Sequence, residues 1–315
     1  MKILFFISQL HHSGGMEHTV VDKANFLSNC GHDVMFVTYA NKGKSTYFKL
    51  SANVKWVDVD CRYFEAYKLP IFKRLLFLIK KKKEFRTKLA QIIHYFNPDV
   101  IDIVIPNTTF FIYDLVKIAK SVKIILECHI ANSIPNMKKP PTFERLLYVF
   151  NKPHKAIKKI DLIIALTFRD AKYWQSLQVK NIRVIPNPIT FPPIETEDSE
   201  KEVGRILAVG RLDSQKRFDR LIESFAIIAW KYPIWHIDIY GDGNEKDSLE
   251  KQIASLGLSN RVVIHSTTSK IYKEYQKSQF LVLSSDYEGL PLVILESMAC
   301  GTPVLSCDCP NVSHQ

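Results

Sequence analysis

Two glutamates, Glu288 and Glu296, stand eight residues apart around a predicted strand-to-helix turn. The apolar run 280–283 predicts a strand, and Pro291 suits the first position of a following helix. A helix N-terminus offers free N–H groups and the positive end of a dipole, so the turn predicts an anion site. Glu296 would lie roughly 7.5 Å along the helix axis. A nucleoside diphosphate-sugar has this layout, with sugar hydroxyls, phosphates and ribose hydroxyls in order.

On the two glutamates alone, a capping Glu288 and a merely solvated Glu296 are an equally good interpretation. The neighbouring residues decide between the two. Residues 288–291 are Glu-Gly-Leu-Pro, and residues 297–304 end in Gly-Thr-Pro-Val. With the Glu-x7-Glu spacing, these strings resemble the retaining glycosyltransferases of the GT-B fold, in the large family-four group. The resemblance covers about residues 1–310 and is strongest over 204–305.

The resemblance assigns roles around this turn. It implies that Glu288 binds the hydroxyls of the donor sugar and that Glu296 binds ribose hydroxyls. Gly289 and Leu290, at the helix mouth, would belong to the donor site beside the diphosphate. Charge developing on the departing diphosphate would then be stabilised electrostatically.

A second charged string, Gly210-Arg211-Leu212 with Lys216 farther on, follows a predicted strand. Arginine offers a planar bidentate fork and lysine a compact point charge, which suits a diphosphate leaving group. Ser214 is the expected N-cap of the next helix. The string closely resembles the family's Gly-Arg-Leu…Lys motif, which implies catalytic roles for Arg211 and Lys216 and donor binding at Gly210.

The first half of the chain offers weaker motifs. Gly14 and Gly15 follow the first predicted strand, where a plain strand-to-helix turn is the simpler interpretation. They are similar to a family Gly-Gly-x-Glu loop that faces the donor phosphates, so the resemblance implies donor binding. His129 closes another strand, and a lone histidine is more often structural. The resemblance implies that His129 contacts the donor sugar, and Gly15 and His129 would complete the site across a cleft.

The paired glycines Gly241 and Gly243 follow another strand in the second half. A tight turn is the favoured explanation for them, ahead of ligand contact. The adjacent His11 and His12 could suggest a metal site, but no acidic or cysteine partner stands at a ligand spacing. We therefore expect no metal and no cofactor beyond the nucleotide-sugar co-substrate.

Strand-like and helix-like runs alternate along the chain, which predicts parallel sheets with crossover helices. The acidic, proline-containing stretch near 186–203 interrupts the pattern, which restarts at Gly204. The expected fold is therefore α/β, with two Rossmann-like domains facing a cleft. We expect an N-terminal acceptor-side domain over 1–190, a linker over 191–203 and a nucleotide-sugar-binding domain over 204–315. The last residues do not match the family's continuation, so this second domain is expected to be truncated.

Composition and motif spacing argue against several other classes of protein. The chain has 315 residues, of which 46% are hydrophobic and 24% charged, as in ordinary globular proteins. Its six cysteines form no Cys-x-x-Cys pair or zinc spacing and fit a reducing cytoplasm. The glycine fingerprint of a nicotinamide dehydrogenase is missing. The short apolar N-terminus predicts a buried strand and not a signal peptide.

The net charge of +11 is concentrated over 68–88, where nine basic residues face the single acid Glu84. Apolar and aromatic residues alternate with these charges, which favours binding to an anionic membrane surface. A solvated helix packed on the core is the main alternative, and nucleic acid is disfavoured because no recognition module accompanies the patch.

Together these features predict a cytoplasmic enzyme, peripheral on the inner membrane face and engaged in cell-surface polysaccharide or glycolipid synthesis. The resemblance implies transfer of a hexose or N-acetylhexosamine, with retention, from a nucleotide sugar to a glycan or lipid-linked acceptor. A UDP-sugar is preferred to a GDP-sugar. The alternative is a truncated, non-catalytic remnant that binds donor or membrane without turnover.

Overall fold

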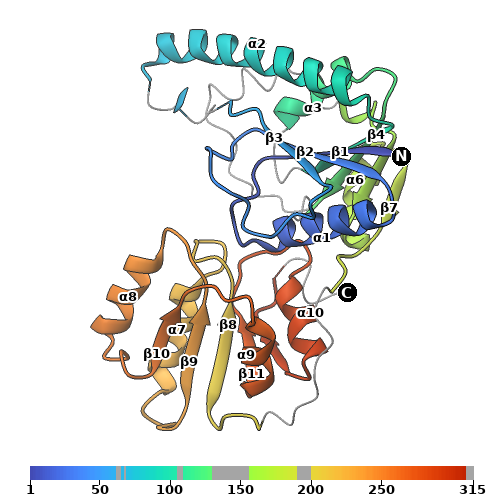
Figure 1. Cartoon of the computed structure of the whole chain (residues 1–315). Coiled ribbons are helices and arrows are strands. Elements are labelled where there is room, and N and C mark those ends of the chain that lie inside the picture. The colour runs from blue at the N-terminus through green and yellow to red at the C-terminus, as the bar shows by residue number, and fades with distance from the viewer. Residues whose placement is uncertain (62–64, 67–68, 105–108, 130–155, 190–199, 310–315) are drawn as a thin grey trace. The chain divides into compact units, whose positions relative to one another are not determined.

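Parallel sheets organise both parts of the chain, which we describe from a computed structural model. It describes residues 1–61, 65–66, 69–104, 109–129, 156–189 and 200–309. Contacts divide the chain into two units, residues 1–12 with 16–186 and residues 13–15 with 187–315. Figure 1 shows their elements, and each unit is considered by itself.

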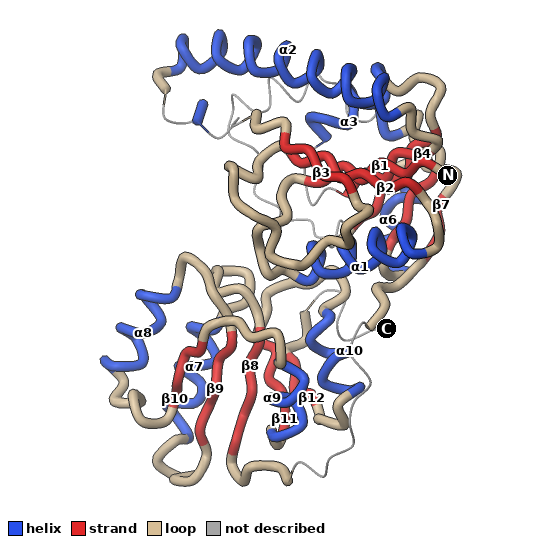
Figure 2. The backbone as a smooth tube through the Cα atoms, viewed as in Figure 1, coloured by secondary structure: helices blue, strands red, loops and turns tan. Residues whose placement is uncertain are grey.

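Within the described residues, the first unit holds a seven-stranded sheet in the order β3-β2-β1-β4-β5-β6-β7. Figure 2 draws its strands in red. All neighbouring strands in it pair in parallel. The strands are β1 (Lys2–Ile7), β2 (Asp33–Thr38), β3 (Lys55–Asp58), β4 (Val100–Val104), β5 (Lys123–Cys128), β6 (Leu162–Ala165) and β7 (Ile182–Val184). The helices described in this unit are α1 (Gly15–Asn29), α2 (Ile71–Phe96), α3 (Thr109–Ile118) and α6 (Phe168–Ser176).

Both faces of this sheet are covered, and β1 is accordingly apolar and buried from Ile3 to Ile7. Successive strand residues point to opposite faces. On one face Phe5 packs in a cluster with Val20 of α1. On the other face Phe6 packs in a cluster with Phe85 of α2 and Leu115 of α3. The apolar run at the N-terminus is thus a buried central strand, as its sequence predicts.

The second unit holds a five-stranded parallel sheet in the order β10-β9-β8-β11-β12. Its strands are β8 (Arg205–Val209), β9 (His236–Tyr240), β10 (Val262–His265), β11 (Phe280–Leu283) and β12 (Val304–Ser306). Its described helices are α7 (Phe218–Ile228), α8 (Lys246–Ser255), α9 (Ile271–Lys277) and α10 (Leu292–Ala299). The cores place α7 and α8 on one face and α9 and α10 on the other. In this sheet β9 and β10 lie on one side of β8, and β11 and β12 lie on the other. The loops after β8 and β11 therefore lie side by side.

The predicted α/β pattern is confirmed, with two parallel-sheet Rossmann-like units. Residues 191–199 of the expected linker lie outside the described residues. Ser214 is not a helix N-cap, because α7 begins at Phe218 and its cap residue is Arg217 in a left-handed conformation. The residues just before Arg217 instead form hydrogen bonds with the loop after β11, so α7 begins farther along the chain.

Gly241 and Gly243 are required by close backbone contact. A Cβ added to Gly241 would lie 1.9 Å from the carbonyl oxygen of Gly210, and one on Gly243 would lie 2.2 Å from that of Leu212. The Leu212 amide donates to the Asp242 carbonyl at 3.0 Å, which joins the loops after β8 and β9. Neither glycine has a positive φ, so close packing against the loop after β8, and not a tight turn, explains them.

The six cysteines are all free thiols. Cys30 and Cys307 are exposed, one in each unit. Burial raises the pKa of Cys61 to about 12 and that of Cys309 to about 11. The buried thiols are therefore protonated at neutral pH and poorly nucleophilic.

We predict that Gly241→Ala destabilises the protein by about 3 kcal/mol, because its methyl group overlaps a backbone carbonyl that cannot rotate away. Gly257→Ala is the matched control. Gly257 lies just beyond the C-terminal end of α8, with φ +69° and nothing within 4 Å of an added Cβ. It should cost only about 1 kcal/mol for the left-handed backbone. Urea unfolding of both variants measures the difference, and equal losses would contradict the steric argument.

Candidate active site

Glu288 and Lys216 form a buried ion pair at the carboxyl ends of β11 and β8. Lys216 Nζ lies 2.7 Å from Glu288 Oε1, and the two side chains are 13% and 7% exposed. The hydroxyl of Ser285 donates to the same oxygen at 2.6 Å. Two candidates chosen separately from the sequence are thus in direct contact, and Ser285 joins them.

Backbone and side-chain hydrogen bonds hold the two loops together. The Asp286 amide donates to the Gln215 carbonyl at 2.9 Å, and Gln215 Nε2 donates to the Tyr287 carbonyl at 2.9 Å. The Ser284 hydroxyl donates to the Lys216 carbonyl at 2.7 Å. We call these three bonds the loop seam. The seam fixes the backbone on either side of the ion pair, which limits how far the two charges can move apart.

Gly210 and Arg211 lie beside this pair in different ways. A Cβ on Gly210 would approach Lys216 Cε at 3.2 Å, so the glycine leaves room for the lysine stem. The Arg211 side chain is 51% exposed, and its guanidinium is 3.2 Å from Asp213. Arg211 can therefore turn toward an incoming anion without first leaving a buried partner.

The helix after Glu288 begins one residue later than the sequence suggests. Pro291 is the N-cap residue, with extended ψ of 108°, and α10 begins at Leu292. No side chain caps this N-terminus. Gly289 and Leu290 form the turn between the glutamate and the helix. The first amides of α10 and its positive dipole end therefore form a candidate anion site, as the sequence predicts.

Glu296 is partly buried on α10 and accepts a hydrogen bond from the hydroxyl of Tyr275 of α9 at 2.9 Å. Burial and the negative charge of Glu296 raise the pKa of Tyr275 well above its usual value, so the phenol stays a donor. The hydrogen bond from Tyr275 therefore holds Glu296 in place, so this carboxylate is not simply solvated. This contact could not be predicted from the sequence, because α9 carries no motif.

In the first unit, His129 belongs to a buried charged cluster. Its Nε2 lies 3.3 Å from Glu127 Oε2. Lys23 of α1 contacts the other oxygen of Glu127 and lies 2.6 Å from Asp102 Oδ2 of β4. Glu127 lies two residues before His129 but was not predicted as a site residue from the sequence. Lys23 and Asp102 belong to no recognisable motif. We call these four residues the His129 cluster.

The loop after β1, which holds Gly14 and Gly15, is organised by Asn41. Its buried side chain accepts from the Leu10 amide at 2.8 Å and lies 3.4 Å from His11 Nδ1. The rings of His11 and His12 lie 4.2 Å apart. Within the ranges that the structure describes, no three His, Cys, Asp or Glu side chains gather as a metal site would require.

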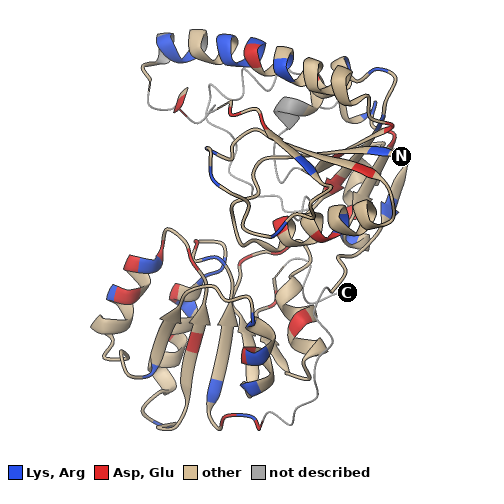
Figure 3. Ribbon diagram, in the orientation of Figure 1, with Lys and Arg blue, Asp and Glu red and all other residues tan. Residues whose placement is uncertain are grey.

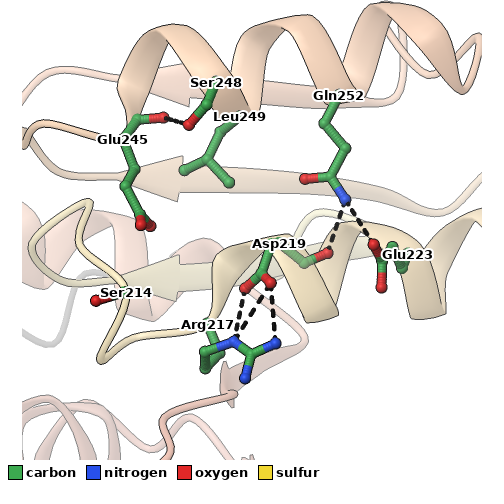
Figure 4. Close-up of a pocket in the computed structure, with 8 residues that line it drawn as sticks. All are labelled: Ser214, Arg217, Asp219, Glu223, Glu245, Ser248, Leu249 and Gln252. Atoms are coloured by element: carbon green, nitrogen blue, oxygen red, sulfur yellow. Dashed lines mark hydrogen bonds and ion pairs between the residues drawn. The ribbon is translucent and has the colours of Figure 1, made fainter.

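A separate hollow of about 460 Å³ lies between α7 and α8 (Figure 4). It is lined by Ser214, Arg217, Asp219, Glu223, Glu245, Ser248, Leu249 and Gln252. Arg217 is already bonded to Asp219 at 3.0 Å. The three carboxylates there would repel a diphosphate, so charge excludes this hollow as its site. The candidate donor site is the ion pair and the helix N-terminus beside it.

Comparison with known proteins agrees with this geometry. Residues 13–191 match the model for glycosyltransferase Family 4, and residues 194–315 match the model for group 1 glycosyl transferases. The chain belongs to glycosyltransferase family 4. An uncharacterized glycosyltransferase of Haemophilus influenzae is 30% identical to this glycosyltransferase over 99% of the chain and 82% of the relative.

Two further proteins extend the comparison. An α-1,4-N-acetyl-D-galactosaminyltransferase of Campylobacter jejuni, named for a diNAcBac-PP-undecaprenol substrate, is 27% identical over 95% of this chain and 77% of its own. The structure of HepE from Anabaena in complex with UDP-glucose superposes with a TM-score of 0.69 at 18% identity, covering 99% of this chain and 81% of HepE. At that identity the superposition establishes the fold, which is the GT-B fold.

We predict that Lys216→Met destabilises this glycosyltransferase by about 3 kcal/mol, because it leaves the Glu288 carboxylate buried without its cation. The double variant Lys216→Met/Glu288→Gln should lose less than the sum of the single variants, with a coupling of about 1–3 kcal/mol. Urea unfolding measures both quantities.

The exposed pair of Lys123 and Asp161, 3.0 Å apart, is the matched control. Its coupling should stay below about 1 kcal/mol because both charges are hydrated. Equal coupling in the two pairs would show that burial does not strengthen the Lys216–Glu288 contact.

Proposed function

We propose that this glycosyltransferase transfers a hexose or N-acetylhexosamine from a nucleoside diphosphate-sugar, with retention of anomeric configuration and without a metal. The acceptor is a glycan or a lipid-linked glycan in cell-surface polysaccharide or glycolipid synthesis. The observation that carries the proposal is the buried contact of Lys216 with Glu288 next to the uncapped N-terminus of α10. A cation, a hydroxyl-binding carboxylate and free helix amides converge there.

Each charge has a distinct task in this proposal. In the free protein, Lys216 and Glu288 neutralise one another. When the sugar donor binds, Lys216 contacts the β-phosphate instead of Glu288, and Glu288 accepts hydrogen bonds from sugar hydroxyls. Arg211 and the first amides of α10 bind the remaining phosphate oxygens, and Gly210 and Gly289 let the diphosphate approach the backbone. Glu296, held by Tyr275, binds ribose hydroxyls. Gly14 and Gly15 belong to donor binding, and His129 of the first unit contacts the sugar.

The reaction breaks the bond between the anomeric carbon and the β-phosphate oxygen and forms a bond to an acceptor oxygen on the same face. The acceptor proton passes to the departing phosphate. Negative charge grows on the diphosphate during this step, and Arg211, Lys216 and the helix dipole stabilise it, so no metal is required. The HepE complex with UDP-glucose supports a UDP-sugar as the first donor to test, ahead of a GDP-sugar.

Arg211→Ala and Glu288→Ala should each lower kcat/KM for transfer at least about 100-fold, because the first removes a charge that stabilises the departing diphosphate and the second removes the acceptor that positions the sugar. Lys231→Ala, an exposed change in the same unit, should leave kcat/KM unchanged. The assay follows release of UDP or GDP from a panel of nucleotide sugars and the product's anomeric proton by NMR. Near-wild-type rates in either site variant, or an inverted product, would refute the assignment. Donor binding without turnover would favour a non-catalytic role.

Helix α2 supports the proposed membrane partner. Figure 3 shows Lys and Arg spread along this helix. Leu76 and Ile79 are 71% and 58% exposed, although both are apolar. Lys80 and Lys83 are exposed close to them, while Phe85 of the same helix is buried in the core. The alternative of a solvated helix explains Phe85 but leaves the exposed Leu76 and Ile79 without a partner.

We therefore extend the proposal to peripheral binding at the anionic, cytoplasmic face of a membrane through residues 68–88. Exposed apolar side chains beside lysines suit the boundary between headgroups and acyl chains. Each lysine adds about 1 kcal/mol of attraction to anionic lipid. No described helix is long and apolar enough to cross a membrane.

Sedimentation with vesicles tests this surface. Wild-type protein should bind vesicles of 30 mol% phosphatidylglycerol at least about tenfold more tightly than neutral phosphatidylcholine vesicles. Lys80→Glu/Lys83→Glu should abolish that preference. Lys158→Glu/Lys159→Glu, an equal charge change at exposed positions of the same unit, should keep it. Equal binding of wild type to both vesicles would refute the proposed membrane partner.

A further inference from the structure

The His129 cluster contains an arrangement that the proposed chemistry has not used. The two carboxylate oxygens of Glu127 contact different side chains. Its Oε1 contacts the Lys23 ammonium, and its Oε2 lies 3.3 Å from His129 Nε2. The side chains of Glu127 and His129 are only 8% and 4% exposed. A buried carboxylate thus connects a buried lysine head to a histidine ring.

The hydrogen positions follow from the chemistry of the groups. An ionised carboxylate can only accept, so His129 Nε2 must carry the hydrogen that it shares with Glu127. In a neutral imidazole the other nitrogen, Nδ1, is then an acceptor. Nδ1 is buried and has no hydrogen-bond partner among the residues that the structure describes. A buried acceptor without a partner is costly unless a ligand supplies the missing donor.

The charges of the cluster keep this arrangement consistent. Burial alone would favour a neutral Glu127, but the hydrogen bond from His129 and the charge of Lys23 lower its pKa, so it stays ionised. Burial raises the pKa of Asp102, which favours its protonated form. Lys23 and Glu127 then balance each other's charge within the cluster.

We propose that Glu127 and Lys23 are positioning residues that hold His129 as its Nε2–H tautomer and present Nδ1 as an acceptor to a sugar hydroxyl. Lys23 fixes Glu127, and Glu127 fixes the ring. This inference rests on the proposed transfer reaction for the identity of the hydroxyl, but the tautomer itself does not depend on that reaction. The proposal therefore requires a donor sugar with a free hydroxyl at the ring position that contacts His129 Nδ1.

Long-range ¹H–¹⁵N NMR of histidine-labelled protein tests the tautomer directly. His129→Gln identifies the signal among the ten histidines. Wild type should show Nε2 protonated and Nδ1 unprotonated at neutral pH. Glu127→Gln should mix the two tautomers, because an amide can either accept or donate. Lys123→Met, which removes an exposed paired lysine on β5, should leave the His129 signals unchanged.

Kinetics supply the second measurement. Glu127→Gln should lower kcat/KM about 10-fold to 100-fold, the range for loss of a group that orients a histidine. Glu127→Gln added to His129→Gln should cause no further loss, because both changes remove one contact. If Glu127→Gln does not fold, Lys23→Met/Glu127→Gln removes both opposite charges and takes its place.

The outcomes separate this inference from the proposed function. An Nδ1–H tautomer in wild type, an unchanged tautomer in Glu127→Gln, or additive kinetic losses would overturn the positioning role even if transfer occurs. Absence of transfer with every donor would refute the proposed function. The NMR result on the same protein would still decide the tautomer.

Discussion

The ion pair between Lys216 and Glu288 is the interaction on which the second unit's site depends. It brings a cation from the loop after β8 against a carboxylate from the loop after β11, with both side chains nearly buried. Such a pair is stable only if its surroundings complete its hydrogen bonds. Ser285 donates such a bond to Glu288, the loop seam fixes the backbone around the pair, and Gly210 leaves room for the lysine stem. The glycine contacts at Gly241 and Gly243 in turn support the β8 loop.

Much of this arrangement could be predicted from sequence, and the limit has a physical origin. Alternating apolar runs predict the parallel sheets, and strand ends predict where Glu288 and Lys216 lie. Their direct contact joins residues 72 positions apart, and no local pattern encodes it. Lys23 looks like any surface lysine on a helix until tertiary packing places it against two carboxylates. The late start of α7 likewise follows from bonds between loops, which override the capping preference of Ser214.

Buried and exposed charges have different effects in this protein. At the Lys216–Glu288 pair and in the His129 cluster, buried charges meet opposite charges, which keeps each group fixed. On α2 the positive residues outnumber their partners, and Lys80 and Lys83 face solvent. Buried compensation gives geometric precision, whereas an exposed excess gives long-range attraction that falls off with salt. The proposed donor site depends on the first property, and the proposed membrane contact depends on the second.

The distribution of thiols has a practical consequence. Cys30 and Cys307 are the exposed cysteines among the described residues, and one belongs to each unit. The buried Cys61 and Cys309 have raised pKa values and should react slowly with maleimides. The natural sequence therefore offers two attachment points for a fluorescent donor and acceptor dye. Energy transfer between them would measure how the separation of the two units responds to ligands, without any engineered residue.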